Sequence, residues 1–491
     1  MNLIDRRPQM APGIARSDAE AVNDKDTREL YQKREPIYPK LVKGPFRRFK
    51  WIFMALALGL YYVLPFVRWD RGPNAPDQAV LVDFANARFY FFFIEIWPQE
   101  VYYITGLLIL AALLLFLATA LFGRVWCGYA CPQTVWTDLF IAVERFFEGD
   151  RNKRMKLDKA PRSFDKARKK ISKHAVWLVI AAATGGAWIL YFYDAFDLVE
   201  NFLTGEAALT SYVFFVLLTF TTYTLAGTMR EQVCTYMCPW PRIQAAMTDR
   251  EALNVAYRVD RGEPRGAHKA GDSWEGRGDC IDCKACVAAC PMGIDIRNGP
   301  QLECIGCALC IDACNDIMDK VGRPRGLIAY ETDDNIDRRL KGETPRYRFI
   351  RVRTLYYGIT ALIVAGIMLA GLLNRTELEL NADRDRNPNY VMLSDGSVRN
   401  GYTVKVLNKA GTERDFVLSV EGNPAFDVRV LGEETGETLT VDADETRDFR
   451  VFLTLPPGAI DSASEPVTFV VEDPASGERA ETQTVFQAGG R

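Results

Sequence analysis

The chain has 491 residues, which is too long for one compact domain and indicates about three. Its net charge is −3, from 60 Lys and Arg against 63 Asp and Glu, and this balance excludes a chain that is basic throughout, as dedicated nucleic-acid binders are. Apolar residues make up 48% and charged residues 25%, which excludes disorder along the whole chain. The unusual feature is twelve cysteines, all within residues 127–314, against two histidines.

The first fifty residues form a polar arm. Residues 1–50 are rich in Pro, Arg and Asp and lack the early apolar stretch of a signal peptide. We expect this arm to be a mobile cytoplasmic tail.

Five apolar runs without a charged residue follow. About twenty helical residues at 1.5 Å each cross a hydrocarbon layer of ~30 Å. Buried helices of soluble proteins rarely run so long without a charge, so the five runs predict five transmembrane helices. The shorter stretch Phe89–Trp97 cannot span, and we expect an interfacial segment there. The five runs are Trp51–Val67, Val101–Phe122, Ala175–Tyr193, Ala207–Gly227 and Thr354–Leu373.

Charges between the runs predict the orientation, because cytoplasmic loops carry an excess of Lys and Arg. Residues 123–174 contain 13 Lys and Arg against 6 Asp and Glu, and basic residues also precede the first and the last run. Residues 68–100 have 3 basic and 5 acidic residues, and 194–206 have 4 acidic residues and no basic one. We expect a multi-pass membrane protein with its N-terminus on the cytoplasmic side and its C-terminus on the outer side.

Two short cysteine motifs follow the second and the fourth run. They are Cys127-x3-Cys131-Pro132 and Cys234-x3-Cys238-Pro239, so the chain contains two copies of a unit of helix, outer loop, helix and CxxxCP. A spacing of four predicts both sulfurs of a pair on one helix face, about 6 Å apart along the axis. That arrangement suits two ligands of one metal or a strained dithiol. Arg124 and Arg230 precede the pairs, and a nearby guanidinium favours thiolate.

Two interpretations of these four cysteines remain open. Brought together, the pairs would form a four-thiolate site at the membrane surface, suited to Cu(I), zinc or iron–sulfur. The alternative is two pairs of buried, inert cysteines, since free cysteine packs well in apolar surroundings. Because the motif occurs twice at equivalent positions, we favour a redox or metal role and treat these four cysteines as the candidate catalytic residues.

The other eight cysteines form a duplicated ferredoxin motif between the fourth and the fifth run. Three thiolates at two-residue gaps hold three iron corners of a 4Fe–4S cluster, and the fourth cysteine of each run ligates the other cluster. Pro291 follows the first run, whereas Asn315 follows the second. The predicted ligands are Cys280, Cys283, Cys286 and Cys314 for the first cluster and Cys304, Cys307, Cys310 and Cys290 for the second.

Zinc ribbons and disulfides are the alternatives for these eight cysteines. Zinc would use isolated CxxC pairs roughly 15–20 residues apart and would leave the third and fourth cysteine of each run unexplained. Disulfides do not persist in a reducing cytoplasm. The histidines indicate little: we expect His174, at the inner end of the third run, to be solvated, and His268, in a glycine-rich linker, to have no specific role.

Residues 374–491, with 12 basic and 22 acidic residues, are predicted to form an all-β domain. Short β-rich runs alternate with turn formers such as Gly422-Asn423-Pro424. This punctuation predicts an immunoglobulin-like β-sandwich without its disulfide, serving as a docking or structural module. The runs are Tyr402–Leu407, Phe416–Glu421, Phe426–Leu431, Phe449–Leu455 and Val467–Glu472.

The predicted fold class is therefore a multi-domain membrane protein with an α-helical transmembrane bundle, a bacterial-type double-cluster ferredoxin domain and a C-terminal immunoglobulin-like domain. The expected parts are the tail (1–50), the first four spans with both CxxxCP motifs (51–257), the ferredoxin domain (258–345), the fifth span (346–373) and the β-domain (374–491).

Taken together, these features resemble the CcoG/FixG/RdxA family, accessory proteins for assembly of cbb3-type cytochrome c oxidase. The resemblance covers about residues 35–491. The ferredoxin motif is generic, and the CxxxCP pairs with this topology are shared with polyferredoxin-like quinol dehydrogenase subunits such as NapH. The outer β-domain favours the CcoG type. The resemblance implies a location in the bacterial inner membrane, with the N-terminus and the clusters in the cytoplasm and the C-terminal domain in the periplasm.

The resemblance implies a cupric reductase that reduces Cu(II) to Cu(I), so that copper chaperones or oxidase assembly factors can take the soft ion through sulfur. It implies that Cys127/Cys131 and Cys234/Cys238 form the copper or redox-relay site, and that an electron donor of unknown identity serves the two clusters. Two other functions remain open: a quinol-oxidising subunit of a respiratory chain, and a non-enzymatic scaffold that binds assembly factors through the β-domain.

Overall fold

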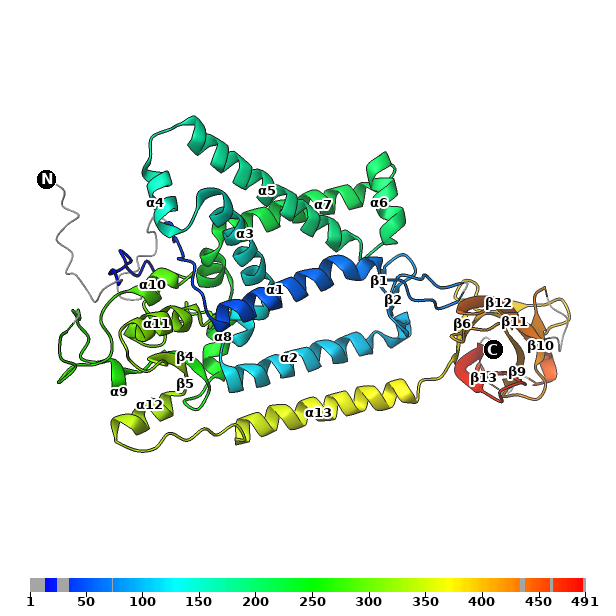
Figure 1. The fold of residues 1–491 in the computed structure, drawn as a ribbon. Coiled ribbons are helices and arrows are strands. Elements are labelled where there is room, and N and C mark those ends of the chain that lie inside the picture. The colour runs from blue at the N-terminus through cyan, green and yellow to red at the C-terminus, as the bar shows by residue number, and fades with distance from the viewer. Residues whose placement is uncertain are drawn as a thin grey trace. The chain divides into compact units, whose positions relative to one another are not determined.

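Helices dominate the chain up to residue 373 and strands dominate after it (Figure 1). The computed structural model describes residues 14–23, 35–72, 74–269, 271–432, 438–459 and 462–488. The chain divides into two units, one within residues 1–67 and 79–368 and the other within 68–78 and 369–491.

Four helical segments of the described residues are long and apolar enough to cross a membrane. α1 (Pro45–Val63) continues through the short 3-10 turn η1 (Leu64–Phe66). α7 (Leu209–Thr222) continues into η4 (Tyr223–Met229), a segment of π-helix. The other two are α2 (Tyr102–Phe122) and α13 (Val352–Leu373).

The predicted third span, Ala175–Tyr193, lies in α5 (Phe164–Ile189). This helix is not among the four, because it begins with a charged stretch up to Lys173 and ends before the apolar run does. Ser163 caps its N-terminus and accepts a hydrogen bond from the backbone N–H of Lys166. A fifth span therefore stays a prediction.

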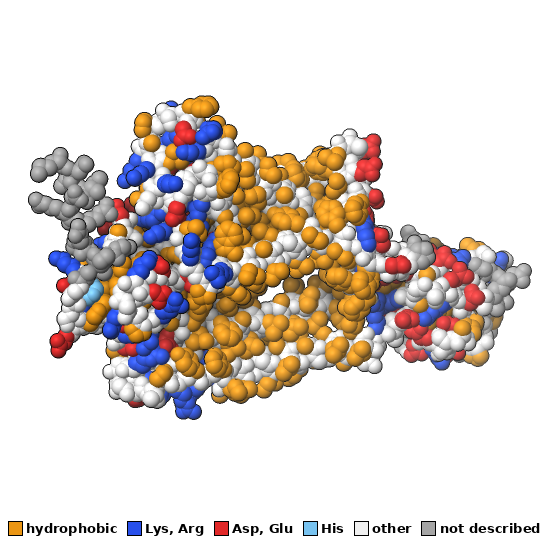
Figure 2. Space-filling view, viewed as in Figure 1, with side chains coloured by type: hydrophobic (Ala, Val, Ile, Leu, Met, Phe, Trp, Pro, Cys, Tyr) orange, Lys and Arg blue, Asp and Glu red, His pale blue; other side chains and the backbone are white. Residues whose placement is uncertain are grey.

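Apolar side chains on these helices are exposed. Leu56 is 68% exposed, Leu108 66% and Phe220 63%. Figure 2 shows hydrophobic side chains gathered along the helices of the first unit, with Lys and Arg gathered at one end of them. In water such exposure would cost about 25 cal/mol per Å² of apolar surface, and a lipid environment removes that cost. These helices indicate a membrane protein.

The segments between the long helices are themselves ordered. β1 (Val80–Asp83), β2 (Arg88–Phe91) and β3 (Ile94–Ile96) form a small antiparallel sheet in that order. The stretch Phe89–Trp97, expected as an interfacial segment, thus supplies most of a β-hairpin. Its place relative to the membrane surface stays a prediction. The remaining elements here are η2 (Pro98–Glu100), α3 (Pro132–Glu148), α4 (Arg151–Lys159), α6 (Ala195–Thr204) and α8 (Trp240–Met247).

The ferredoxin part is closed by two strands. β4 (Asn254–Tyr257) pairs antiparallel with β5 (Ile328–Glu331). Between them lie the two cysteine runs, which lead into α10 (Ala285–Ala289) and α11 (Leu309–Lys320). The core beneath includes Ile281, Met318 and Leu327, each at most 2% exposed. Short elements complete this part: α9 (Val259–Gly262), η6 (Ile296–Asn298) and α12 (Asp333–Leu340).

The described portions of the N-terminal arm are packed against this part. The Ser17 backbone N–H donates to the Cys283 carbonyl at 2.8 Å, and the Asn23 side-chain amide donates to the Met292 carbonyl at 2.7 Å. Ile14 and Ile37 are buried. The prediction of a mobile tail was therefore wrong for residues 14–23 and 35–44, because backbone hydrogen bonds to the first cysteine run fix a segment whose polar composition gave no sign of docking. Residues 1–13 and 24–34 lie outside the described residues.

The first long helix is tied to the ferredoxin part at its N-terminus. The Asp312 carboxylate on α11 accepts hydrogen bonds from the backbone N–H groups of Arg47, at 2.7 Å, and Phe46, at 3.4 Å. A carboxylate here satisfies unpaired N–H groups and favours the helix dipole. α1 and α11 are thus held together.

The second unit is a β-sandwich, as predicted. One sheet has the order β10-β12-β8-β6, with β7 paired to β8, and the other has the order β11-β9-β13-β14. Tyr402 and Phe469 fill the space between the sheets, and the Tyr402 hydroxyl donates to the Val485 carbonyl of the opposite sheet at 3.1 Å. Each predicted β-rich run overlaps a strand. The strands are β6 (Leu378–Arg384), β7 (Val391–Met392), β8 (Val398–Asn408), β9 (Arg414–Glu421), β10 (Asp427–Val430), β11 (Leu439–Val441), β12 (Glu445–Leu455), β13 (Ser464–Glu472) and β14 (Arg479–Gln487).

Candidate functional site: two sulfur-lined cavities and a four-cysteine site

The two cysteine runs share one backbone conformation. In each run the residues on either side of the second cysteine have positive φ: Asp282 (51°) and Lys284 (54°) around Cys283, and Gly306 (68°) and Ala308 (59°) around Cys307. Left-handed conformations cost non-glycine residues about 1–3 kcal/mol each. The chain accepts that strain twice at equivalent positions, which turns the first three thiols of each run toward a common point.

The first run lines one small cavity together with the last cysteine of the second run. Apolar residues such as Ile281 and Leu327 complete its wall, with Lys284 and Arg297 at its edge. The cysteines that line it are Cys280, Cys283, Cys286 and Cys314.

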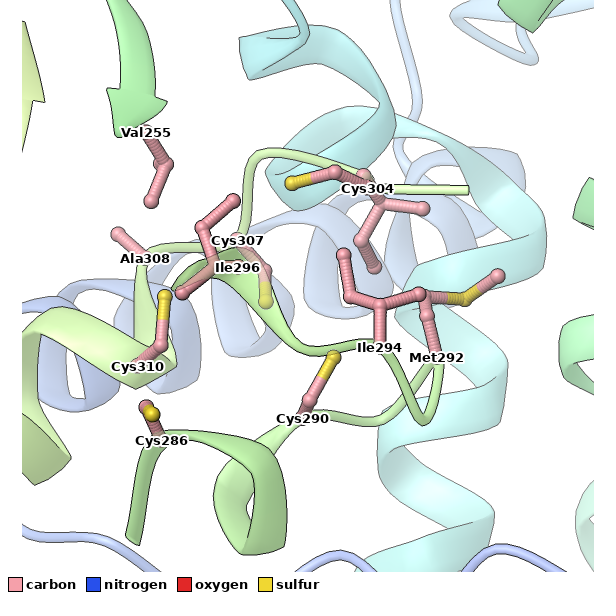
Figure 3. A pocket seen from close by; sticks show the side chains of 11 residues that line it. Val255, Cys286, Cys290, Met292, Ile294, Ile296, Cys304, Cys307, Ala308 and Cys310 are labelled. Carbon is pink, nitrogen blue, oxygen red and sulfur yellow. The ribbon is translucent and has the colours of Figure 1, made fainter. Parts of the chain in front are cut away.

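The second cavity is lined by the second run and by the last cysteine of the first (Figure 3). Its other lining residues are apolar, among them Met292, Ile294 and Ile296. The cysteines that line it are Cys290, Cys304, Cys307 and Cys310, and Cys286 reaches it as well. The chain thus brings the cysteines together in the two crossed groups that their spacing predicts.

The thiols and apolar residues that line both cavities are of the kinds that hold iron–sulfur clusters. Burial raises the pKa of Cys290 and Cys314 to about 12, so these apolar walls disfavour a bare thiolate and require a positively charged partner for one. Among the described residues, no three His, Cys, Asp or Glu side chains converge closely enough to hold one metal ion. Thiols spaced around a cavity suit a group with several iron corners.

The CxxxCP motifs lie in π-helix, which corrects the predicted geometry. The segments are η3 (Trp126–Ala130) and η5 (Val233–Met237), and each ends at the second cysteine of its motif. The backbone N–H of Cys131 donates to the Trp126 carbonyl at 2.9 Å, an i→i+5 bond, and Cys131 itself is extended. The prediction that both sulfurs of a pair lie on one face of an α-helix was therefore wrong. π-Turns are rare and frequent at functional sites.

The two CxxxCP pairs meet. Cys127 and Cys234 both contact the apolar group formed by Met292, Ile294 and Ile305, which also lines the second cavity. Burial raises the pKa of Cys234 to about 12, and the sulfurs of Cys131 and Cys127 add to the effect. The fold therefore brings the cysteines of two motifs more than a hundred residues apart near one another, with Cys127 and Cys234 beside the second cavity, although no three of the described cysteines converge closely enough to hold one metal ion.

Arg124 joins the first motif to the second cysteine run. Its guanidinium donates to the carbonyls of Leu302 and Cys304, the latter at 2.8 Å, and to the Pro241 carbonyl, after the second motif, at 2.7 Å. One side chain thus fixes both CxxxCP motifs and the second run to one another. At Cys127 burial dominates and raises the pKa to about 12, although Arg124 opposes the shift.

Arg230 does not serve Cys234 in this way. Its guanidinium pairs with the Glu144 carboxylate at 2.8 Å and donates to the Gly227 carbonyl. Glu144 also pairs with Arg154 and with Lys173, at 3.3 Å, in a cluster that is buried on every side. The prediction that Arg230 favours thiolate at the second motif was wrong, because its guanidinium pairs with the buried Glu144 carboxylate and not with Cys234.

Gln244 on α8 is a site residue that spacing could not reveal. It is fully buried, and its Oε1 accepts a hydrogen bond from the Cys127 thiol at 3.3 Å. Its Nε2 has no hydrogen-bond partner among the described residues. A buried unpaired amide costs about 1–3 kcal/mol, so a second acceptor belongs in this site.

Both histidines are more constrained than predicted. His174 Nδ1 lies 2.8 Å from the Tyr223 hydroxyl, at the start of η4, and the ring packs edge-on against Trp177. His268 is 5% exposed and stacks on Trp274, with ring centroids 4.0 Å apart. Neither lies among the site cysteines.

Family models match three parts of the chain. Residues 229–333 match a 4Fe-4S dicluster domain, and residues 104–153 match a 4Fe-4S binding domain. Residues 368–489 match the IG-like fold at the C-terminal of FixG. The second of these matches contains the first CxxxCP motif. The chain therefore has iron–sulfur binding domains and an immunoglobulin-like C-terminal domain.

Curated relatives are similar along nearly the whole chain. The nitrogen fixation protein FixG of Rhizobium meliloti is 51% identical over 99% of this chain and 99% of its own length. Proteins RdxB and RdxA of Cereibacter sphaeroides are 51% and 49% identical, over 95% and 90% of this chain and 99% and 93% of their own lengths. A crystal structure of a FixG-related protein from Vibrio parahaemolyticus matches 23% of this chain and 96% of that chain, at 27% identity and a TM-score of 0.20.

Proposed function

The chain belongs to the family of FixG, RdxA and RdxB, and from this premise we propose that it reduces Cu(II) to Cu(I) for the assembly of a cbb3-type cytochrome c oxidase. The broader statement rests on the family and its domains: the chain is an iron–sulfur electron-transfer protein. Copper as the acceptor is the proposal.

In this proposal two 4Fe–4S clusters occupy the sulfur-lined cavities. Cys280, Cys283, Cys286 and Cys314 hold one, and Cys304, Cys307, Cys310 and Cys290 hold the other. When bound, such a cluster carries one electron at a time. The apolar residues around each group exclude water, and Pro291 ends the short helix so that Cys290 reaches across to the second group.

The four CxxxCP cysteines are proposed as the copper site. Thiolates prefer the soft ion Cu(I), and Cu(II) becomes Cu(I) by gaining one electron. Because burial raises the pKa of Cys127 and Cys234 to about 12, binding of copper by these two thiols releases their protons. The observation that carries the proposal is that both motifs meet against the residues that line the second cavity.

The basic residues at one end of the first unit support a cytoplasmic placement for the cysteine runs. The β-domain then lies in the periplasm, where the proposed partners, copper chaperones or oxidase assembly factors, are available to it. The bilayer itself is the partner of the apolar helices.

Purified protein, reduced anaerobically with dithionite and desalted, tests the copper step. We expect Cu(I), trapped by a bicinchoninate chelator, to form with the parent chain and to be lost in Cys127→Ser and Cys234→Ser, with the iron content kept. If both variants reduce copper as fast as the parent, the four-cysteine site is not where copper is reduced.

A further inference from the structure

A third cavity, larger than the two sulfur-lined ones, lies beside Cys304. The space between its side chains and its mouth is about 1060 Å³. It is lined from the end of α2 (Phe122), the end of α8 (Ala245, Thr248), the start of β4 (Asn254) and the second cysteine run. Cys304 lines this cavity and the second sulfur-lined cavity, so a ligand here contacts the wall of the proposed cluster site.

Two exposed apolar side chains lie on the wall of this cavity. Phe122 is the last residue of the apolar helix α2 and is 45% exposed, and Leu302 on the cysteine run is 49% exposed. A ligand with an apolar body can therefore reach the cavity along the inner end of α2.

The lining charges cancel. Arg124 and Arg250 face Asp249 and Asp333, and both guanidiniums are engaged: Arg124 with backbone carbonyls, as described, and Arg250 with the Asp337 carboxylate. The two positive and two negative lining side chains balance, so this lining has no net positive charge that would attract a phosphate. An uncharged ligand is therefore favoured over a nucleotide or a flavin phosphate.

One lining side chain needs a hydrogen-bond donor. Gln301 gives its amide N–H to the Asp295 carbonyl at 2.6 Å, but its Oε1 is buried and accepts no hydrogen bond from the described residues. A ligand hydroxyl would satisfy this oxygen. Thr248 and Asn254 add further polar groups around the same space.

We propose that this cavity binds the ring of a membrane quinol and that the quinol is the electron donor. This inference rests on the proposed function, which requires such a donor. A quinol is uncharged, carries hydroxyl donors and an apolar tail, and gives electrons at the edge of a membrane. Its oxidation breaks two O–H bonds, forms two C=O bonds and releases two electrons and two protons. The electrons go to the two one-electron carriers of the proposed function, and the protons pass to the Asp333 carboxylate and to water.

Two neighbouring alanines on α8 give a matched test. Ala245 lines the cavity and Ala246 does not, and both are exposed, so a phenylalanine at either has the same helix propensity and no core to disturb. Full-length protein in detergent is titrated with decylubiquinone by calorimetry. We expect saturable binding that weakens about tenfold or more in Ala245→Phe and is unchanged in Ala246→Phe.

A second measurement does not depend on any variant. An azido-quinone photolabelled onto the parent chain should mark peptides within 245–254 or 296–306, and labelling confined to other peptides overturns the proposal. So does the absence of saturable quinone binding, equal binding by Ala245→Phe, or binding of flavin mononucleotide that Ala245→Phe removes.

Failure here is distinguishable from failure of the proposed function. Copper reduction by dithionite-reduced protein bypasses the donor and should be the same in Ala245→Phe and the parent. If copper is not reduced although quinone binds, the copper proposal fails and the donor site stands.

Discussion

Gly128, the residue after the first cysteine of the first CxxxCP motif, allows that motif to touch the second cysteine run. A Cβ built on Gly128 would lie 2.9 Å from the carbonyl oxygens of Gly306 and Ile305 and 3.0 Å from the Cα of Cys307. Ordinary van der Waals contact starts at 3.4 Å, so Gly128→Ala requires the two segments to separate by about 0.5 Å. All three contacts are backbone atoms, which cannot turn aside as a side chain does.

Overpacking of this kind costs about 1–3 kcal/mol. We therefore expect Gly128→Ala to lower the thermal midpoint of the detergent-solubilised protein and to slow copper reduction, because the four-cysteine site is pushed away from the second cavity. The second motif has Thr235 at the equivalent position and so carries a Cβ where the first motif has none.

Gly59 in α1 gives the control, since a Cβ there meets nothing within 4 Å. Gly59→Ala should keep parental stability, or gain some, and should reduce copper normally. The reasoning is refuted if Gly128→Ala matches Gly59→Ala in both the melting curve and the copper assay.

Three further predictions follow from the described contacts. Glu144→Ala removes the buried carboxylate that pairs with Arg230 and one of the two that pair with Arg154 and Lys173, the other being Glu148; it should lower the free energy of unfolding by about 3 kcal/mol in denaturant melts, whereas Glu200→Ala, at an exposed position, should cost little. Because burial raises the pKa of Cys127 and Cys234 to about 12, their alkylation by iodoacetamide in metal-free protein should still rise about tenfold between about pH 10 and pH 11; alkylation that levels off above about pH 10, as for a thiol with the ordinary pKa of 9.0, would contradict this assignment. The parent should contain about eight irons per chain, and Cys290→Ser should disturb the electron paramagnetic resonance signal of one cluster only; changes in both signals would show that the crossed ligand sets are not independent.

The crossed grouping of the eight cysteines was predictable because it follows from chain connectivity. Three cysteines at two-residue gaps can face one point, and the fourth, beyond a short helix, reaches the other group. The β-domain could also be predicted from the sequence, because buried and less buried residues alternate along strands such as β8, as a β-sandwich requires. Both signals are local in the sequence.

Contacts between distant segments were not predictable. Nothing in the spacing of the CxxxCP motifs reveals that the two pairs meet, that Gly128 lies against the second run, or that Arg124 links three segments. The helix type was missed for a related reason, since a π-turn depends on how the following proline-led helix is packed. Gln244 gives no signal in the sequence beyond its position on α8.

Polar composition was misleading at the N-terminus and at His268. The described N-terminal residues dock largely through backbone hydrogen bonds, which any sequence can make, and the buried side chains among them, such as Ile14, Ala19 and Ile37, are scattered. His268 lies in a glycine-rich stretch, yet Trp274 covers it. Neither contact leaves a periodic pattern that sequence reasoning could find.

The most direct test of the central claim follows electrons and copper in one sample. Protein reduced anaerobically and freed of reductant is mixed with Cu(II), while the paramagnetic signal of the clusters and the chelated Cu(I) are recorded together. The account predicts that the parent loses its cluster signal as about two Cu(I) per chain appear, and that Cys127→Ser/Cys234→Ser keeps its clusters reduced. Cluster oxidation by Cu(II) at the parental rate in that double variant would contradict it.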